Sequence, residues 1–254
     1  MAERILFGNT ILKGINKGGS LKPDENGYYT VVLGALGVQN SANEIYTDTE
    51  TARRTFSENS TLMRRISRGL LRGEYGHPDP SDFPNFMMFE RRVRAIKEDQ
   101  VSHHISDVWL EEIDYNGQRV CGILGKLKPC GPYGPALKES LDNPKENVTF
   151  SGRYYSNVSK TPTGIQCREI HTVATWDYVS EPGIEMAQKY SSPTLESAND
   201  TVFYREHLEE AMRYEASHQE LAVSMESGGY SAKDLIADLG FKPKERPTRA
   251  SMRW

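Results

Sequence analysis

The sequence predicts an α+β protein with a mainly β, barrel-like core surrounded by helices. Three observations lead to this class. Runs rich in β-branched and aromatic residues recur from residue 28 to residue 179, at lengths typical of strands. Short segments with capping residues and helical spacing lie between them, and such alternation is typical of a barrel or a strongly bent sheet with added helices. After residue 182 the strand-like runs end and a helical extension follows.

In the first part of the chain, caps and turn residues set the expected boundaries. Asp48 or Thr49 can cap one helix, and the next helix carries Leu62 and Ile66 at helical spacing. Residues 78–90 are rich in Pro, Asp and Phe and predict a long loop. The elements expected up to residue 100 are strands at 4–7, 28–38 and 91–96 and helices at 48–56 and 60–71.

In the second part, Asn116-Gly117 predicts a hairpin turn between two long strands. Gly240 is expected to end the last helix, and the basic residues 241–254 are expected to be disordered. The elements expected after residue 100 are strands at 101–113, 119–127, 148–155 and 166–179 and helices at 136–141, 201–225 and 231–239.

Composition narrows the class of protein. The 254 residues carry a net charge of -4, which does not favour a general nucleic-acid binder. The longest apolar run, residues 30–38, is strand-sized and too short to cross a membrane, and the N-terminus lacks the pattern of a signal peptide. Cys121, Cys130 and Cys167 form no CxxC pair, which predicts reduced thiols and no structural zinc site.

The apolar fraction is low for a chain of this length. Hydrophobic residues make up 37% and charged residues 26% of the chain. We therefore expect one core domain over residues 1–182 and a helical, partly flexible extension over residues 183–254.

The segment Gly73-Glu74-Tyr75-Gly76-His77-Pro78-Asp79 is the one most suggestive of chemistry. Gly76 lets the backbone turn, and Pro78 disfavours a helical conformation at His77. His77 is therefore displayed at a bend. Its imidazole titrates near neutral pH and suits proton transfer. A simple turn whose histidine caps a neighbouring group explains the same residues.

Two later strand-like runs supply candidate partners for His77. Ser151 lies in the β-prone run 148–155, which Ser151-Gly152-Arg153 interrupts, and Asp177 lies in the β-prone run 170–182. A serine hydroxyl becomes nucleophilic when a base removes its proton, and a carboxylate can orient that base. The alternatives are an ordinary strand serine and an acid bonded to backbone amides.

Taken together, these segments resemble the prohead core (capsid maturation) proteases of tailed bacteriophages, serine peptidases related to that of phage T4. The family's Gly-Glu-x-x-His-Pro segment corresponds to residues 73–78, and its Ser-x-Arg segment to residues 151–153. Its Asp-x-Val segment, followed by proline, corresponds to residues 177–179 and Pro182. The resemblance extends over roughly residues 25–185.

One departure from the family pattern sharpens the assignment. The family often has a second serine after the nucleophile, and this chain has Gly152 there. Ser151 is then the only serine in register. The resemblance implies that His77 is the general base, Ser151 the nucleophile and Asp177 the third member. The oxyanion needs donors near the serine, and Gly152 and Arg153 can supply them as oxyanion or substrate-binding groups, through their backbone amides and the Arg153 guanidinium. A surface salt bridge is the alternative for Arg153.

His171 is the alternative third member, because the related herpesvirus assembly proteases use a second histidine on the strand after the serine. Residues 171 and 177 lie about 20 Å apart along a regular strand, so one site cannot use both unless the chain bends. We favour Asp177, where the phage motif matches. The resemblance also implies a fold like that of the herpesvirus assembly proteases.

The function implied is a serine endopeptidase that cleaves scaffold, core and capsid proteins inside the prohead, within the bacterial host cytoplasm. The resemblance implies no cofactor, metal, nucleic acid or membrane, and it allows a homo-oligomer for which the residues themselves give no sign. Family members resemble one another in cutting after glutamate. Glu226, before Ser227-Gly228-Gly229, is therefore a candidate self-cleavage site; a helix ending at glycines is the alternative.

Two other classes of function stay open at this stage. The charged, helical C-terminal third fits a non-catalytic scaffold or core protein with a protease-like fold. A metal hydrolase using His77, His103 and Glu74 is the other. His103 and His104 cannot share a metal on a regular strand, because adjacent residues point to opposite faces.

Overall fold

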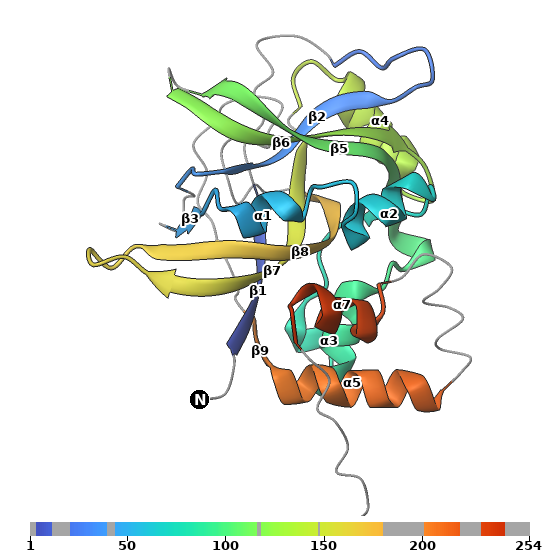
Figure 1. The fold of residues 1–254 in the computed structure, drawn as a ribbon. Coiled ribbons are helices and arrows are strands. Elements are labelled where there is room, and N and C mark those ends of the chain that lie inside the picture. The colour runs from blue at the N-terminus through green and yellow to red at the C-terminus, as the bar shows by residue number, and fades with distance from the viewer. Residues whose placement is uncertain are drawn as a thin grey trace, which may run out of the picture.

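Figure 1 shows the computed structural model of the chain, in which two β-sheets lie one above the other and helices cover their sides. The structure describes residues 4–11, 21–39, 44–115, 118–146, 148–179, 201–218 and 230–241. For residues 4–11 and 201–202 it describes the backbone and not the side chains.

The first sheet has five strands and the second has four. Strand β3 runs parallel to β8, and all other neighbours are antiparallel. The first sheet has the order β3 (Glu44–Tyr46), β8 (Gln166–Val179), β7 (Thr149–Lys160), β1 (Arg4–Ile11), β9 (Thr201–Tyr204). The second has the order β2 (Tyr29–Leu36), β6 (Gln118–Pro129), β5 (Val101–Tyr115), β4 (Arg72–Glu74).

The prediction of a barrel-like core is not confirmed by this topology. Within the described segments, each sheet ends on two edge strands, so neither sheet closes on itself. The sheets instead face each other across a hydrophobic core, with Ile105 and Ile123 from one sheet and Phe150 and Trp176 from the other. A mixed α/β fold of open sheets replaces the barrel, and the likeness to the herpesvirus assembly proteases stays a prediction.

Six α-helices are described, and four of them begin at a side-chain cap. Thr49, Ser60, Asn85 and Ser231 each accept a hydrogen bond from a backbone N–H of the first turn, which satisfies a donor that has no partner within the helix. The helices are α1 (Glu50–Arg54), α2 (Thr61–Ser67), α3 (Phe86–Arg94), α4 (Gly134–Asp142), α5 (Arg205–Ser217) and α7 (Ala232–Asp238). Two 3-10 turns, η1 (Pro80–Asp82) and η2 (Glu98–Gln100), flank α3 in the chain.

Two sequence expectations are wrong at α3. Residues 91–96 were expected as a strand and residues 78–90 as a loop, but α3 occupies residues 86–94. Asn85 starts the helix, and Phe89 and Val93, four residues apart, bury the same face. Tertiary packing therefore outweighs the local composition in this segment.

A smaller correction concerns the helix expected at 201–225. Residues 201–204 form strand β9, which pairs with β1, and α5 begins only at Arg205. The turn at 116–117, residues 183–200, Glu226 and residues 242–254 lie outside the described residues.

The C-terminal elements pack against the rest of the chain. A second hydrophobic cluster joins Phe89 and Val93 of α3 to Phe203, Leu208 and Leu235 of the C-terminal part. Figure 1 shows α3, α5 and α7 gathered below the first sheet. The described part of the expected extension thus shares a core with α3.

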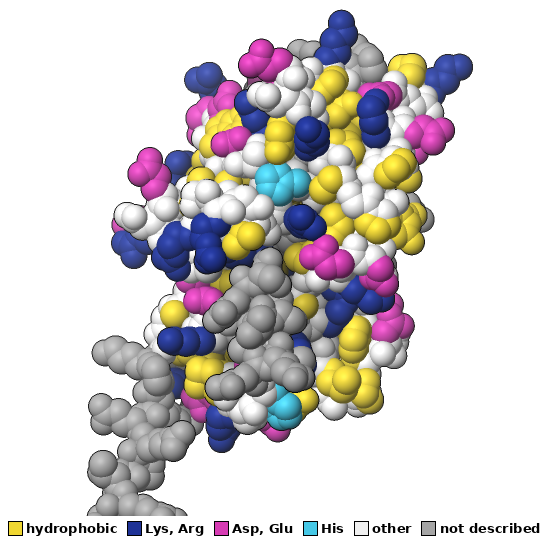
Figure 2. Space-filling model, turned by 90° about the vertical axis from the view of Figure 1, so that its right-hand side faces the viewer, with side chains coloured by type: hydrophobic (Ala, Val, Ile, Leu, Met, Phe, Trp, Pro, Cys, Tyr) yellow, Lys and Arg dark blue, Asp and Glu magenta, His cyan; other side chains and the backbone are white. Residues whose placement is uncertain are grey.

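The surface of the described residues carries both signs of charge. Figure 2 shows acidic and basic side chains interspersed over one face, in keeping with the small net charge. None of the described helices is long and apolar enough to cross a membrane.

Candidate active site

Strands β7 and β8 place the candidate residues on one face of the first sheet. Ser151 lies directly opposite Asp177, and Arg153 lies opposite Thr175. Because side chains alternate along a strand, all four share a face, while Trp176 points to the core between the sheets. Directly opposed residues of antiparallel strands have Cβ atoms roughly 4.5–5.5 Å apart.

Strand β4 brings the histidine segment to the end of β8. The Glu74 N–H donates to Asp177 Oδ1 (3.0 Å), and the Gly76 N–H donates to the Tyr178 carbonyl (2.8 Å). Gly76 has a φ of 77°, which an L side chain rarely adopts and which turns the chain toward His77. The bend expected from Gly76 and Pro78 is therefore present.

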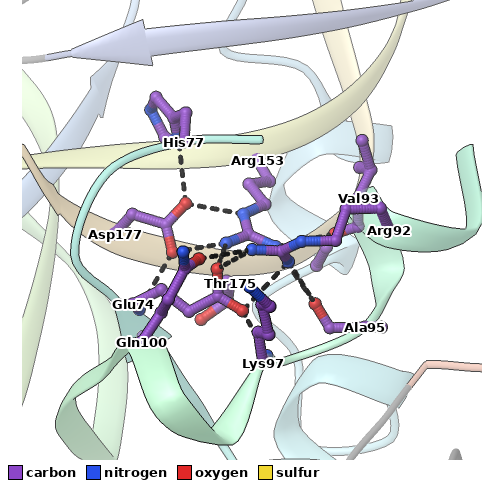
Figure 3. Close-up of polar contacts among 12 residues, drawn as sticks. Glu74, His77, Arg92, Val93, Ala95, Lys97, Gln100, Arg153, Thr175 and Asp177 are labelled. Atoms are coloured by element: carbon purple, nitrogen blue, oxygen red, sulfur yellow. Dashed lines mark hydrogen bonds and ion pairs between the residues drawn. The ribbon is translucent and has the colours of Figure 1, made fainter. Parts of the chain in front are cut away.

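His77 and Asp177 form a short hydrogen bond. The distance from His77 Nδ1 to Asp177 Oδ2 is 2.7 Å, and the side chains are 16% and 0% exposed (Figure 3). The carboxylate accepts, so Nδ1 carries the proton and Nε2 is the nitrogen available as a base. Among the described residues, the buried Nε2 has no hydrogen-bond partner. This is the tautomer that proton abstraction at Nε2 requires.

Arg153 contacts the other side of Asp177. Its Nε donates to Asp177 Oδ2 (2.6 Å) and its Nη2 to Asp177 Oδ1 (2.9 Å), a bidentate pair. Nη2 also donates to Glu74 Oε2 (2.7 Å), and Nη1 donates to the carbonyls of Val93 (3.1 Å) and Ala95 (3.2 Å). A guanidinium has five N–H donors, and these five acceptors use all of them.

The guanidinium of Arg153 therefore differs from the oxyanion donor suggested by the sequence. The side chain is fully buried, and all its donors are directed at protein oxygen atoms. The geometry makes it the partner of Asp177 and Glu74. Gly152 of β7 lies opposite Trp176 of β8, and its backbone N–H is the only candidate oxyanion donor that this residue has.

Glu74 is the centre of a second set of contacts. Its carboxylate accepts from Arg153, from Arg92 Nη1 (3.0 Å) and Nη2 (2.5 Å), and from the backbone N–H of Lys97. Arg92 also donates to Gln100 Oε1 (2.9 Å). Two buried carboxylates, Asp177 and Glu74, thus face two guanidinium groups, which balances the charge of the cluster (Figure 3).

The cluster keeps Asp177 ionised. Burial alone would raise the pKa of Asp177, but the charge of Arg153 and the hydrogen bond with His77 hold it well below its usual value. Burial would likewise lower the pKa of Arg153, yet the charges of Asp177 and Glu74 raise it above its usual value. An ionised Asp177 is the form that accepts the Nδ1 proton of His77.

His171 lies apart from this cluster. The ladder between β7 and β8 skips Ala174 and His171, so two bulges separate His171 from Asp177. The His171 Nε2 is 3.5 Å from Glu169 Oε2. The backbone carbonyl of His171 accepts a hydrogen bond from the Thr55 hydroxyl. The structure therefore places Asp177, and not His171, against His77.

His103 and His104 have separate surroundings. His103 is fully buried, contacts Phe150 edge to face and shares a hydrogen bond with Ser102. His104 bonds Tyr28 and the Gly69 carbonyl. No group of three or more His, Cys, Asp or Glu residues arranged to hold a metal is found in the described segments.

Three contributors to the cluster were not predicted from the sequence. Arg92 and the carbonyls of Val93 and Ala95 belong to a segment expected as a strand. Consecutive charged residues such as Glu90, Arg91 and Arg92 are usually exposed to solvent. The sequence alone does not show which of them a distant segment of the chain will bury.

Comparison with known proteins adds the family. The profile of the peptidase S80 family matches residues 7–235. The chain belongs to the peptidase S80 family. This S80 peptidase is also 36% identical over 203 residues to the capsid maturation protease of Pseudomonas phage phiKZ, covering 78% of this chain and 74% of the relative.

A solved structure is also similar to this S80 family member. The bacteriophage T4 capsid assembly protease matches with a TM-score of 0.44 and 15% identity, covering 70% of this chain and 98% of that chain. The family match spans the whole His77–Asp177 cluster and Ser151, so the candidate site lies inside the region shared with the family.

Proposed function

We propose that this S80 family member is a serine endopeptidase of the phage prohead that cleaves scaffold, core and capsid proteins during head maturation. The observation that carries the proposal is the 2.7 Å bond between His77 Nδ1 and Asp177 Oδ2, with Ser151 opposite Asp177 on the neighbouring strand. The name of the phiKZ relative supports the substrate class and the prohead interior as the place of action.

In the proposed reaction, Ser151 Oγ attacks the carbonyl carbon of the scissile bond while His77 Nε2 accepts the hydroxyl proton. Asp177 accepts the Nδ1–H hydrogen bond and stabilises the imidazolium that forms. His77 then donates the proton to the leaving amine, and an acyl-enzyme remains on Ser151. Water, deprotonated by His77, releases the acyl group and restores the serine.

Arg153 and Glu74 are proposed as positioning residues and not as reacting groups. Arg153 fixes both oxygens of Asp177, and Glu74 fixes Arg153. The oxyanion of the tetrahedral intermediate would be stabilised by backbone N–H donors beside Ser151, with Gly152 as the candidate.

The deciding experiment is labelling by a fluorophosphonate, which reacts with an activated serine. We expect one adduct by intact mass on the wild type and none on Ser151→Ala. Ser156→Ala is the matched control, because Ser156 is equally buried on the same strand. A label that persists on Ser151→Ala would show that another residue is the nucleophile. Wild type that neither labels nor cleaves purified scaffold protein would support the non-catalytic assembly protein instead.

Self-cleavage after Glu226 is a separate part of the proposal. It is supported only by the sequence around Glu226, which lies outside the described residues. Mass spectrometry of aged active protein should find a new C-terminus at residue 226 in the wild type. The Glu226→Gln variant should remain an intact chain. An intact wild-type chain in a sample that cleaves scaffold protein would exclude it.

A further inference from the structure

A buried ion cluster around Arg94 joins α3 to the C-terminal helices. Arg94 Nε donates to Glu90 Oε1 (2.5 Å), and Nη2 donates to Glu90 Oε2 (2.9 Å) and to Glu215 Oε1 of α5 (2.6 Å). Nη1 donates to the carbonyl of Tyr230 (2.6 Å). The other oxygen of Glu215 accepts from the N–H of Ala232, at the start of α7 (3.0 Å). Arg94 is thus held by two segments that are distant in the sequence.

The residues on either side of Arg94 hold the candidate site. The carbonyls of Val93 and Ala95 both accept from Nη1 of Arg153, whose Nε and Nη2 hold Asp177. Figure 3 shows Val93 and Ala95 beside the guanidinium of Arg153. The last turn of α3 therefore carries two functions: its carbonyls face the site, and its Arg94 side chain faces α5 and residue 230.

We propose that Arg94 is a positioning residue that couples the C-terminal helices to the His77–Asp177 pair. Glu215 and the Tyr230 carbonyl fix Arg94, and the fixed last turn of α3 presents the Val93 and Ala95 carbonyls to Arg153. Arg153 in turn orients the carboxylate of Asp177. The C-terminal helices are on this view part of the catalytic domain rather than only an attachment for scaffold proteins.

The burial of the cluster supports a role beyond surface charge pairing. The side chains of Arg94 and Glu90 are 0% exposed and that of Glu215 is 9% exposed. Burial would lower the pKa of Arg94, but the charges of Glu90 and Glu215 keep it above its usual value. A buried pair of this kind is sensitive to the loss of one partner, whereas an exposed pair contributes little.

The proposal depends on the His77–Asp177 pair as the site, and it does not depend on the role of Ser151. The first test uses the full chain and measures by NMR the proton resonance of the His77 Nδ1–H, which donates to Asp177. Glu215→Gln should shift or broaden this downfield resonance. Glu50→Gln, which removes an exposed partner of Arg54 on α1, is the control and should leave it unchanged. A folded Glu215→Gln protein with an unchanged resonance would overturn the coupling, whether or not the protein is a protease.

The second test uses kinetics to separate coupling from general damage. Glu215→Gln should lower kcat about tenfold with little change in KM, since a small misplacement of catalytic groups acts mainly on the reaction step. Combining it with Arg153→Lys should give less than the product of the two effects, because both act through Arg153. Independent, multiplying effects would contradict the proposal. If Glu215→Gln does not fold, Glu215→Asp replaces it in both tests, with the same expected and opposing results.

Discussion

His77 and Asp177 are 100 positions apart in the chain, yet Nδ1 of the imidazole lies 2.7 Å from Oδ2 of the carboxylate. Backbone bonds on both sides fix this approach: the Glu74 N–H donates to Asp177, and the Gly76 N–H donates to the Tyr178 carbonyl. The pair is therefore held by the backbone of β4 and β8 and not by the two side chains alone.

Replacing Asp177 by asparagine tests the orientation of His77. We expect kcat/KM to fall about 1,000-fold or more, because an amide neither holds the same tautomer nor stabilises the imidazolium. Asp79→Asn is the control, since the Asp79 carboxylate lies two residues from His77 and bonds Ser81. Peptide cleavage at saturating and at limiting substrate concentration gives kcat and kcat/KM for both variants. More than a tenth of wild-type activity in Asp177→Asn would contradict the assigned role.

Removing the Arg153 charge should destabilise the whole fold. In Arg153→Met, two buried carboxylates lose their shared partner, and we expect a loss of about 3–5 kcal/mol in unfolding free energy, as for other broken buried pairs. Urea unfolding measures it. Adding Glu74→Gln should restore part of the loss, because one of the uncompensated charges is removed.

Two controls accompany the Arg153 variant. Arg54→Met breaks an exposed pair with Glu50 and should change stability by less than about 1 kcal/mol. A double variant of Arg153 and Glu74 whose loss equals the sum of the single losses would show that the two side chains do not interact energetically.

Gly73 and Gly76 are expected to resist substitution for different reasons. A Cβ at Gly73 would lie 2.0 Å from the Trp176 carbonyl oxygen and 2.3 Å from the His103 ring. Gly73→Ala should therefore cost about 3 kcal/mol, at the upper end of overpacking effects. Gly76 has open space, and Gly76→Ala should cost only about 1 kcal/mol for its positive φ. Equal losses on urea unfolding would refute the steric explanation.

His103 should make stability depend on pH between about 4 and 6.5. Burial lowers its pKa from 6.5 to about 4, so the unfolded chain binds the proton first as the pH falls. Unfolding free energy should therefore decrease as pH falls through this window, by about 3 kcal/mol in total from this group.

The measurement is urea unfolding at several pH values in His103→Asn. The variant should give a flatter curve between pH 6.5 and about 4.5 than the wild type. An unchanged slope in His103→Asn would assign the pH dependence to other groups.

Sequence reasoning succeeded where local chemistry decides the structure. Strand β8 was expected at 166–179 and occupies those residues, since its β-branched and aromatic run has no competing signal. Thr49, one of the two caps expected for the first helix, caps α1. It failed at α3, where Asn85 and the partners of Phe89 and Val93 decide the helix.

By itself, the sequence determined which residue types stand at bends and strand positions: the imidazole between Gly76 and Pro78, and the serine and aspartate on successive strands. Only the tertiary structure decided which of them meet. Two bulges in β8 separate His171 from Asp177. The carbonyls of Val93 and Ala95 accept from Arg153 Nη1 and help to hold this guanidinium against Asp177. The physical reason is that burial of a charge depends on acceptors from distant segments, which no local pattern of residues specifies.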